Sequence, residues 1–169
     1  MSEMATNGRQ PEAFLRDCYV RLRRNERHDI GFGPAWAKRL FPPRNGVYLV
    51  FEDGKPAYVG ESSDMRERLA ELGSVHNHPL PRHIVERHHP SLWRERERMD
   101  HREFATAVRI KARAWMQKHM SVAYIEIPLG RAELEGYVIP RLDNKRRYNK
   151  PARRGLMQRR RLASGESYG

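Results

Sequence analysis

The fold is decided by residues 45–72, which read NGVYLVFEDGKPAYVGESSDMRERLAEL. An alternating run of β-branched and aromatic residues at 46–51 is followed by Asp53-Gly54 and then by a second short run at 57–60. An Asp-Gly pair between two such runs is a strong signal for a tight turn between antiparallel strands. The stretch therefore predicts a β-hairpin.

A short helix is expected directly after the hairpin. Asp64, with a glutamate three residues later, has the form of a capping box, which marks the first turn of a helix. Met65, Leu69 and Leu72 then fall on one side of such a helix. The same helix carries Arg68, so a cationic side chain is expected near the hairpin.

The composition limits the classes of protein to which this chain can belong. A length of 169 residues favours a single domain. The 33 Lys and Arg residues against 21 Asp and Glu residues give a formal charge of +12, which attracts nucleic acid or an anionic membrane surface. No apolar run approaches the roughly 18 residues of a membrane span, so no membrane partner is expected. The single cysteine, Cys18, excludes an internal disulfide and predicts a cytoplasmic location.

The rest of the chain predicts further helices and one more strand. Apolar residues recur at helical spacing in several segments, and residues 121–128 alternate as a strand does. The helices are expected at 11–24, 34–40, 101–119 and 130–143, and residues 25–33 are expected to form a loop. Asp100 begins a second capping box, and Pro140 predicts that the last helix kinks or ends early.

Glu135 has an unusual place in the last predicted helix. The apolar side of this helix is formed by Leu134, Val138, Ile139 and Leu142, and Glu135 lies at the edge of that side, whereas Glu133 lies off it. A carboxylate that faces a core is unfavourable unless a cation or hydrogen bonds compensate for its burial. Glu135 is therefore the better candidate for a metal ligand, and Glu133 for a solvated side chain.

Several histidines follow the hairpin region, among them His76, His78, His83 and His88. No cysteine accompanies them, so a structural zinc site is not favoured. Residues 82–102 contain six arginines and four acidic residues, a cationic surplus of only two. We interpret the histidines as part of an exposed basic loop, and the stretch after them as solvated.

Together these features match the requirements of phosphodiester cleavage. A divalent cation held by few carboxylates polarises the phosphoryl oxygen, and a cationic side chain offsets the charge of the transition state. A tyrosine can act as the base only if a nearby cation lowers its pKa from about 10. Arg68, or a lysine such as Lys55, is expected to supply that charge.

The sequence resembles the GIY-YIG nuclease family at several positions. The two tripeptides that name the family appear as Gly-Val-Tyr at 46–48 and Tyr-Val-Gly at 58–60. Arg68 lies ten residues beyond the tyrosine of the second tripeptide, where the family has its catalytic arginine, which makes Arg66 the weaker choice. Glu135 begins a stretch with isoleucine at its fifth position that closes at Tyr148-Asn149, as the family's metal-binding glutamate does.

The resemblance implies a role for each of these residues. Tyr48 would be the general base or orient the attacking water, Tyr58 would bind a second water or the phosphate, and Asn149 would be a structural hydrogen-bonder. Glu135 would bind Mg²⁺ or Mn²⁺. Many members carry a histidine four residues past the arginine, where this chain has Leu72. Either a nearby histidine, His76 or His78, takes over that role, or the role is absent.

The implied fold is a small α/β (α+β) domain with a three-stranded antiparallel sheet flanked by helices. Its strands would be residues 46–51, 57–60 and 122–127. The predicted organisation is an N-terminal helical extension at 1–45, a nuclease domain at 46–149 with a basic insertion at about 73–120, and a basic flexible tail at 150–169.

The expected activity is that of a divalent-metal-dependent endonuclease that hydrolyses DNA, most simply a sequence-specific restriction-type enzyme. A homodimer would suit a palindromic target. The residues expected to contact nucleic acid are Lys55, Arg66, His76, His78, Arg82, Arg146 and Arg147. The alternatives are a DNA repair or structure-selective nuclease, a non-catalytic nucleic-acid-binding protein on the same fold, and an RNA- or ribosome-associated factor.

Overall fold

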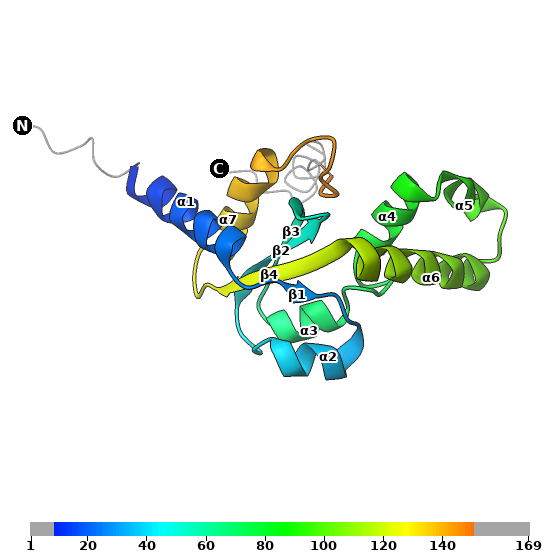
Figure 1. Ribbon diagram of the computed structural model, residues 1–169, viewed down its shortest axis with the longest axis horizontal. Helices are drawn as coiled ribbons and strands as arrows, with labels where there is room; N and C mark the ends of the chain where they lie inside the picture. Colours follow the sequence, from blue (N-terminus) through cyan, green and yellow to red (C-terminus); the bar gives the residue numbers. More distant parts are fainter. Residues whose placement is uncertain (1–8, 151–169) are drawn as a thin grey trace, which may run out of the picture.

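An antiparallel sheet lies at the centre of the computed structural model, which describes residues 9–150 (Figure 1). Its strands are β1 (His28–Asp29), β2 (Gly46–Glu52), β3 (Lys55–Ser62) and β4 (Met120–Glu126), in the order β1-β4-β2-β3. The mixed α and β class and the three predicted strands are confirmed. The strand number is corrected from three to four, because a segment within the predicted loop at 25–33 pairs with β4. Two residues are too few to show the alternation by which a strand is recognised.

The predicted hairpin is formed by β2 and β3. Asp53 and Gly54 at its tip both have positive φ, 49° and 79°, as a type I′ turn requires. The pairing register shifts between Val50 and Phe51. Because β2 lies between β3 and β4 and both of its faces are covered, every residue of this strand is buried.

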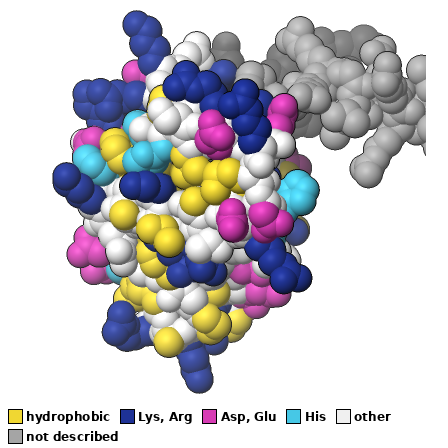
Figure 2. Space-filling model, turned by 90° about the vertical axis from the view of Figure 1, so that its right-hand side faces the viewer, with side chains coloured by type: hydrophobic (Ala, Val, Ile, Leu, Met, Phe, Trp, Pro, Cys, Tyr) yellow, Lys and Arg dark blue, Asp and Glu magenta, His cyan; other side chains and the backbone are white. Residues whose placement is uncertain are grey.

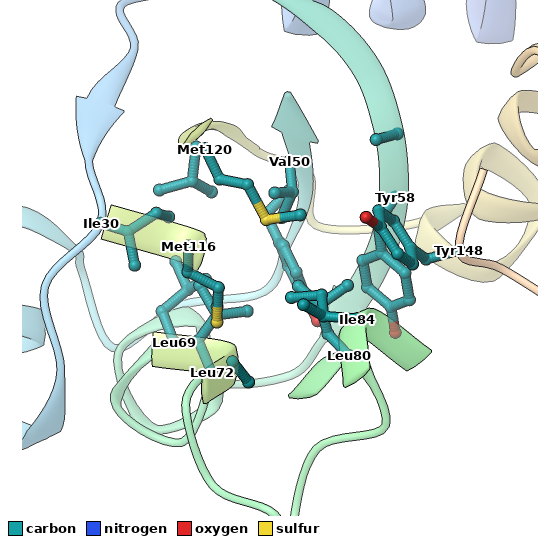
Figure 3. Packing of buried hydrophobic residues seen from close by; sticks show 14 of the residues in the cluster. Ile30, Val50, Tyr58, Leu69, Leu72, Leu80, Ile84, Met116, Met120 and Tyr148 are labelled. Carbon is teal, nitrogen blue, oxygen red and sulfur yellow. The ribbon is translucent and has the colours of Figure 1, made fainter. Parts of the chain in front are cut away.

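Helices cover the two faces of the sheet and form two hydrophobic clusters. On one face, α1 (Arg9–Arg24) packs on β4 and β2, and α7 (Arg131–Val138) packs on β3 and β2. On the other face lie α2 (Gly33–Leu40), α3 (Met65–Ala70), α4 (Leu80–His88) and α6 (His101–His119). Figure 3 shows residues of this second cluster, among them Val50, Leu69, Ile84 and Met116.

Both aspartates predicted to cap a helix do so. Asp64 accepts a hydrogen bond from the Glu67 amide at 2.9 Å, and Asp100 accepts from the amides of Arg102 and Glu103. The helix at 101–119 has the predicted bounds. The predicted helix at 130–143 is shorter: α7 ends at Val138, and a 3₁₀ turn, η2 (Ile139–Arg141), contains Pro140.

The stretch at 82–102 is mostly exposed, as predicted. The exposed loop expected for the histidines is wrong from residue 80 onwards, because the segment is largely helical there. It forms α4, α5 (Pro90–Arg94) and the 3₁₀ turn η1 (Glu95–Glu97) before α6. Leu80, Ile84 and Val85 on α4 are buried in the cluster that also contains residues of α6. These apolar residues recur at helical spacing, but many charged residues and histidines stand between them. The composition of the segment therefore pointed to a loop.

A buried polar network joins the end of β2 to α4, α6 and the last described segment. Glu52 is only 8% exposed, and its Oε2 accepts hydrogen bonds from the Tyr148 hydroxyl and from Trp115 Nε1. A carboxylate only accepts, so the Tyr148 proton goes to Glu52 and the Tyr148 oxygen accepts from His88 Nε2 at 2.7 Å. His88 also stacks on the Trp115 ring with the centroids 3.7 Å apart.

The predicted segments at the two ends are only partly within the structure. Of the predicted tail at 150–169, the structure describes Lys150 alone, and the first eight residues also lie outside the described range. Among the helices at residues 9–150, none combines the length and the apolar character that crossing a bilayer requires.

Candidate active site

Tyr48 lies at the centre of the candidate site, on the middle strand of the sheet. It is fully buried, and its register partner on β3 is Gly60. A Cβ atom at Gly60 would lie only 2.3 Å from the Tyr48 hydroxyl. The glycine of the second tripeptide is therefore required because the Tyr48 ring occupies the space above it.

Tyr58 lies on the neighbouring strand, β3, with its ring centroid 6.2 Å from that of Tyr48. It is 6% exposed, and β3 is an outer strand of the sheet. Burial is the largest influence on both phenols and raises the pKa of each. Both tyrosines are therefore protonated at neutral pH in the free protein.

Arg68 on α3 faces both tyrosines. Its positive charge lowers the pKa of Tyr48 and of Tyr58, opposing the larger effect of burial. The guanidinium donates from Nη1 to the Asn77 carbonyl at 2.9 Å. Among the described residues, it forms no ion pair with Glu67 or Glu71, and Glu71 instead accepts from the Asn77 side chain. Its charge is therefore directed at the two phenols.

His78 is the residue that holds the Tyr48 hydroxyl. Its side chain is 2% exposed, so the predicted contact with nucleic acid is corrected for this residue. His78 Nδ1 accepts from the Leu80 amide at 3.1 Å, and Nε2 lies 2.7 Å from the Tyr48 oxygen. An amide N–H can only donate, so Nδ1 is unprotonated and Nε2 carries the proton that is donated to Tyr48. Leu72 stands at the position where the resemblance implied a histidine, and it is fully buried in the core.

This arrangement fixes the direction of the proton on Tyr48. Since the Tyr48 oxygen accepts from His78, the Tyr48 proton points away from the imidazole, and Tyr58 is the neighbouring phenol with which it interacts. His78 has no free lone pair with which to remove that proton. Its Nε2 can instead donate to the Tyr48 oxygen whether Tyr48 is a phenol or a phenolate, and so it stabilises the phenolate when it forms.

The buried imidazole makes the stability of the fold sensitive to acid. Burial, and then the charges of Arg68 and His83, lower the pKa of His78 from 6.5 to about 3. Between these two pH values the unfolded chain binds a proton that the folded chain does not, so stability falls as the pH is lowered from 6.5. We expect this residue to contribute a loss approaching about 1.4 kcal/mol per pH unit towards pH 4.

Urea unfolding between pH 7 and 4 would measure this loss. The His78→Gln variant is expected to lose less stability over this range than the wild type. The exposed His76 provides the control, and His76→Gln should keep the wild-type dependence. An unchanged pH dependence in His78→Gln would contradict the assignment of the buried neutral imidazole.

Glu135 reaches the same site from the other face of the sheet. It lies half-buried on α7, which packs against β3 and β2, whereas Glu133 is exposed. Burial, and then the charge of Glu61 on β3, raise the pKa of Glu135, while Arg68 lowers it. In turn, the charge of Glu135 raises the pKa of Tyr58. The carboxylate and the phenols are thus brought together at the outer strand, β3.

A second carboxylate, Glu61, was not singled out from the sequence. It forms an ion pair with Arg131, so Arg131 is not the partner of Glu135. Within residues 9–150, no cation forms an ion pair with Glu135. No group of three His, Cys, Asp or Glu side chains gathers as a metal site in the described chain. Mg²⁺ is commonly bound through one or two carboxylates, with phosphate and water completing its shell, so Glu135 beside Glu61 fits this ion.

Asn149 attaches the end of the described chain to the strand that carries Tyr58. Its Oδ1 accepts from the Val59 amide at 2.9 Å, and its Nδ2 donates to the Val59 carbonyl at 2.8 Å. The preceding Tyr148 amide donates to the Ala57 carbonyl at 2.7 Å. The side chain of Asn149 thus pairs with β3 much as a neighbouring strand would.

The side chains predicted to contact nucleic acid are spread over the molecule. Lys55 lies at the hairpin tip, opposite Glu52. It is not among the charges that shift the pKa of either tyrosine. Of the two cations predicted to act on the tyrosines, only Arg68 does so. Arg66 donates from Nε to the Phe41 carbonyl and so joins α3 to the end of α2.

Three of the other side chains predicted to contact nucleic acid form interactions within the protein. His76 is exposed, and Arg82 is exposed but donates from Nε to the Val75 carbonyl. Arg146 forms an ion pair with Asp143. Arg147 donates to the Ile139 carbonyl. These contacts orient the side chains without excluding them from a role at the surface.

Comparison of the chain with models of protein families, with curated proteins and with solved structures finds no match.

Proposed function

We propose that this protein is a divalent-metal-dependent endonuclease that hydrolyses DNA phosphodiester bonds. The observation that carries this proposal is the convergence of Tyr48, Tyr58, Arg68 and Glu135 at β3, where their charges act on one another. The four side chains come from β2, β3, α3 and α7. A hydrophobic core needs no such arrangement of a guanidinium, two phenols and a carboxylate that has no ion-pair partner among residues 9–150.

The residues of the chain divide the work of hydrolysis between them. Arg68 binds the phosphate and offsets the negative charge that develops on it. Tyr48 and Tyr58 orient the attacking water. His78 donates to the Tyr48 oxygen and so stabilises its phenolate form, which would accept a proton from that water. Glu135, with Glu61 beside it, would hold a Mg²⁺ or Mn²⁺ ion, which would supply Lewis-acid polarisation of the phosphoryl oxygen.

The buried phenol predicts the pH dependence of cleavage. Burial holds the pKa of Tyr48 well above 10, so only a small fraction of the phenol is deprotonated near neutral pH. If Tyr48 is the base, this fraction, and with it kcat/KM, should rise about tenfold per pH unit between roughly pH 7 and 9. Initial rates on plasmid DNA at saturating Mg²⁺ would measure it. A pH-independent rate over this range would exclude Tyr48 as the base and leave it a water-orienting role.

The test of the proposed function is DNA cleavage that needs both a divalent ion and Glu135. Supercoiled plasmid and phage DNA would be incubated with wild-type protein in Mg²⁺ and in EDTA. Glu135→Gln removes the charge of the candidate ligand, and Glu133→Gln makes the same change at an exposed position two residues away. We expect cleavage by wild type and Glu133→Gln in Mg²⁺, and none by Glu135→Gln. Equal cleavage by both variants, or cleavage in EDTA, would contradict the proposal.

The pattern of products distinguishes the kinds of nuclease. Discrete fragments of phage DNA would indicate a sequence-specific, restriction-type enzyme, for which a homodimer suits a palindromic site. A metal-dependent smear would indicate a nonspecific or structure-selective enzyme, such as one that acts in DNA repair.

A non-catalytic DNA-binding protein is the second candidate. The burial of Tyr48 and the absence of a three-residue metal group in residues 9–150 favour it. It predicts intact DNA in every lane, together with binding that neither EDTA nor Glu135→Gln changes.

A further inference from the structure

A groove lined by arginines lies between α6 and the loop that follows α3. It has a volume of about 290 Å³. From the loop it is lined by Ser74, Val75 and His76, and from α6 by Arg102, Ala105, Thr106, Arg109 and Arg113. No acidic side chain is among these residues.

The three arginines follow one stripe of α6. Phe104, Val108, Ala112 and Met116 form the buried side of this helix, and the arginines at 102, 109 and 113 lie beside it at intervals of seven and four residues. Residues at such intervals share one side of an α-helix. The stripe therefore belongs to the helix itself, which fixes the spacing of the three Cα atoms.

The cations of this stripe have no anionic partner in the part of the chain that the structure describes. None of Arg102, Arg109 and Arg113 forms an ion pair there, whereas several other arginines do, such as Arg44 with Glu126 and Arg98 with Glu95. Burial, and then the charge of Arg109, lower the pKa of Arg113. Like charges held together on a helix destabilise it unless an anion lies between them.

The surface at the end of the molecule around α4, α5 and α6 differs from the groove. Figure 2 views this end and shows Lys and Arg side chains interspersed with Asp and Glu, with histidines and hydrophobic side chains between them. Such mixed charges largely neutralise one another within a Debye length. Charge of one sign is instead concentrated in the groove.

The loop that forms one wall of the groove also holds Arg68 of the candidate active site. The Asn77 carbonyl accepts from Arg68, and the Asn77 amide donates to Ser74 Oγ. On the other side of the loop, Arg113 donates from Nε to the Gly73 carbonyl at 3.3 Å, and its guanidinium lies over the Phe32 ring. The groove and the phosphate-binding guanidinium are thus separated by one short loop that hydrogen bonds hold in place.

We infer that this groove binds the phosphate backbone of duplex DNA beside the phosphate bound at Arg68. The stripe from Arg102 to Arg113 extends over about 16 Å of helix. Phosphates of one DNA strand recur every 3.4 Å or so along the duplex axis, so the stripe fits a run of successive phosphates better than one small anion. This inference rests on the proposed function for the identity of the ligand. It makes the groove a sequence-independent contact.

The test is the salt dependence of DNA binding by a protein that does not cleave. In a Glu135→Gln background and in EDTA, the affinity for a short duplex would be measured from about 50 to 200 mM KCl. The groove variant carries Arg102→Gln and Arg109→Gln, because both side chains are exposed and make no structural hydrogen bond among the described residues. The control carries Arg94→Gln and Arg98→Gln, which remove the same charge from exposed positions outside the groove.

We expect the slope of log Kobs against log salt concentration to become less steep by about 1.8 in the groove variant, because two phosphate contacts are lost. The control should keep a slope close to that of the parent protein. Equal slopes in all three proteins, or an equal change in the groove variant and the control, would overturn the inference.

The outcome is independent of the test of cleavage. If the groove substitutions change the slope but the wild type leaves DNA intact, the groove binds DNA and the proposed nuclease activity is rejected. Metal-dependent cleavage together with an unchanged slope would retain the nuclease and reject the groove. Circular dichroism at each salt concentration would establish that the variants are folded.

Discussion

Replacing Arg68 by alanine is expected to lower the rate of DNA cleavage by about 1,000-fold while the protein stays folded. The guanidinium is half-buried beside Tyr48 and Tyr58, and it is the cation that acts on both phenols. Removing it leaves the transition state without its positive charge and also raises the pKa of Tyr48 further. Because both effects act on the chemical step, kcat should fall much more than KM rises.

A control for this substitution lies two residues away on the same helix. Arg66 donates to the Phe41 carbonyl and does not act on the tyrosines, so Arg66→Ala should lower stability slightly and leave most of the activity. Single-turnover rates at saturating protein would compare the two variants, and circular dichroism would establish their folding. If Arg66→Ala lost as much activity as Arg68→Ala, the assignment of Arg68 to the reacting phosphate would be wrong.

Replacing Tyr148 by phenylalanine is expected to destabilise the fold by about 2 kcal/mol. The Tyr148 hydroxyl donates to the buried Glu52 carboxylate and accepts from His88, and phenylalanine removes both bonds. Glu52 would then keep Trp115 as its donor in a site that excludes water. A buried charge that loses a donor is destabilising because its desolvation is no longer compensated.

Thermal and urea unfolding would measure this effect, and a chain of this size should lose roughly 4–8 °C in Tm. Tyr137→Phe is the matched control, because Tyr137 is half-buried and its hydroxyl forms no hydrogen bond within residues 9–150. The second substitution Glu52→Gln should make the loss from Tyr148→Phe smaller, since it removes the buried charge. The same loss in both backgrounds would show that the hydroxyl does not act through Glu52.

The parts of the fold that could be predicted from the sequence are those fixed by near neighbours. Asp64 and Asp100 cap helices through amides two or three residues away, and the Asp53-Gly54 turn fixes the hairpin in the same way. The half-buried position of Glu135 could be predicted because its place relative to Leu134 and Val138 is set by the helical repeat. Each of these signals lies within a single turn or helix.

The parts that could not be predicted depend on residues distant in the sequence. His78 meets Tyr48 across thirty residues, and its burial depends on α4, whose apolar positions lie among charges and histidines. Glu61 contributes through its closeness to α7, which follows it by some seventy positions in the chain. The strand β1 exists only because β4 lies beside it. No local pattern contains these contacts, because they form only when the tertiary structure does.

The hydrogen bonds of Tyr148 and Asn149 with β3 also affect how copies of the protein meet. No strand of residues 9–150 pairs with the outer side of β3, and the free amides and carbonyls of such a strand are a template for aggregation. Asn149 occupies both groups of Val59, and Tyr148 occupies the carbonyl of Ala57. The segment that completes the candidate site is therefore also what keeps this edge from joining the sheet of another molecule.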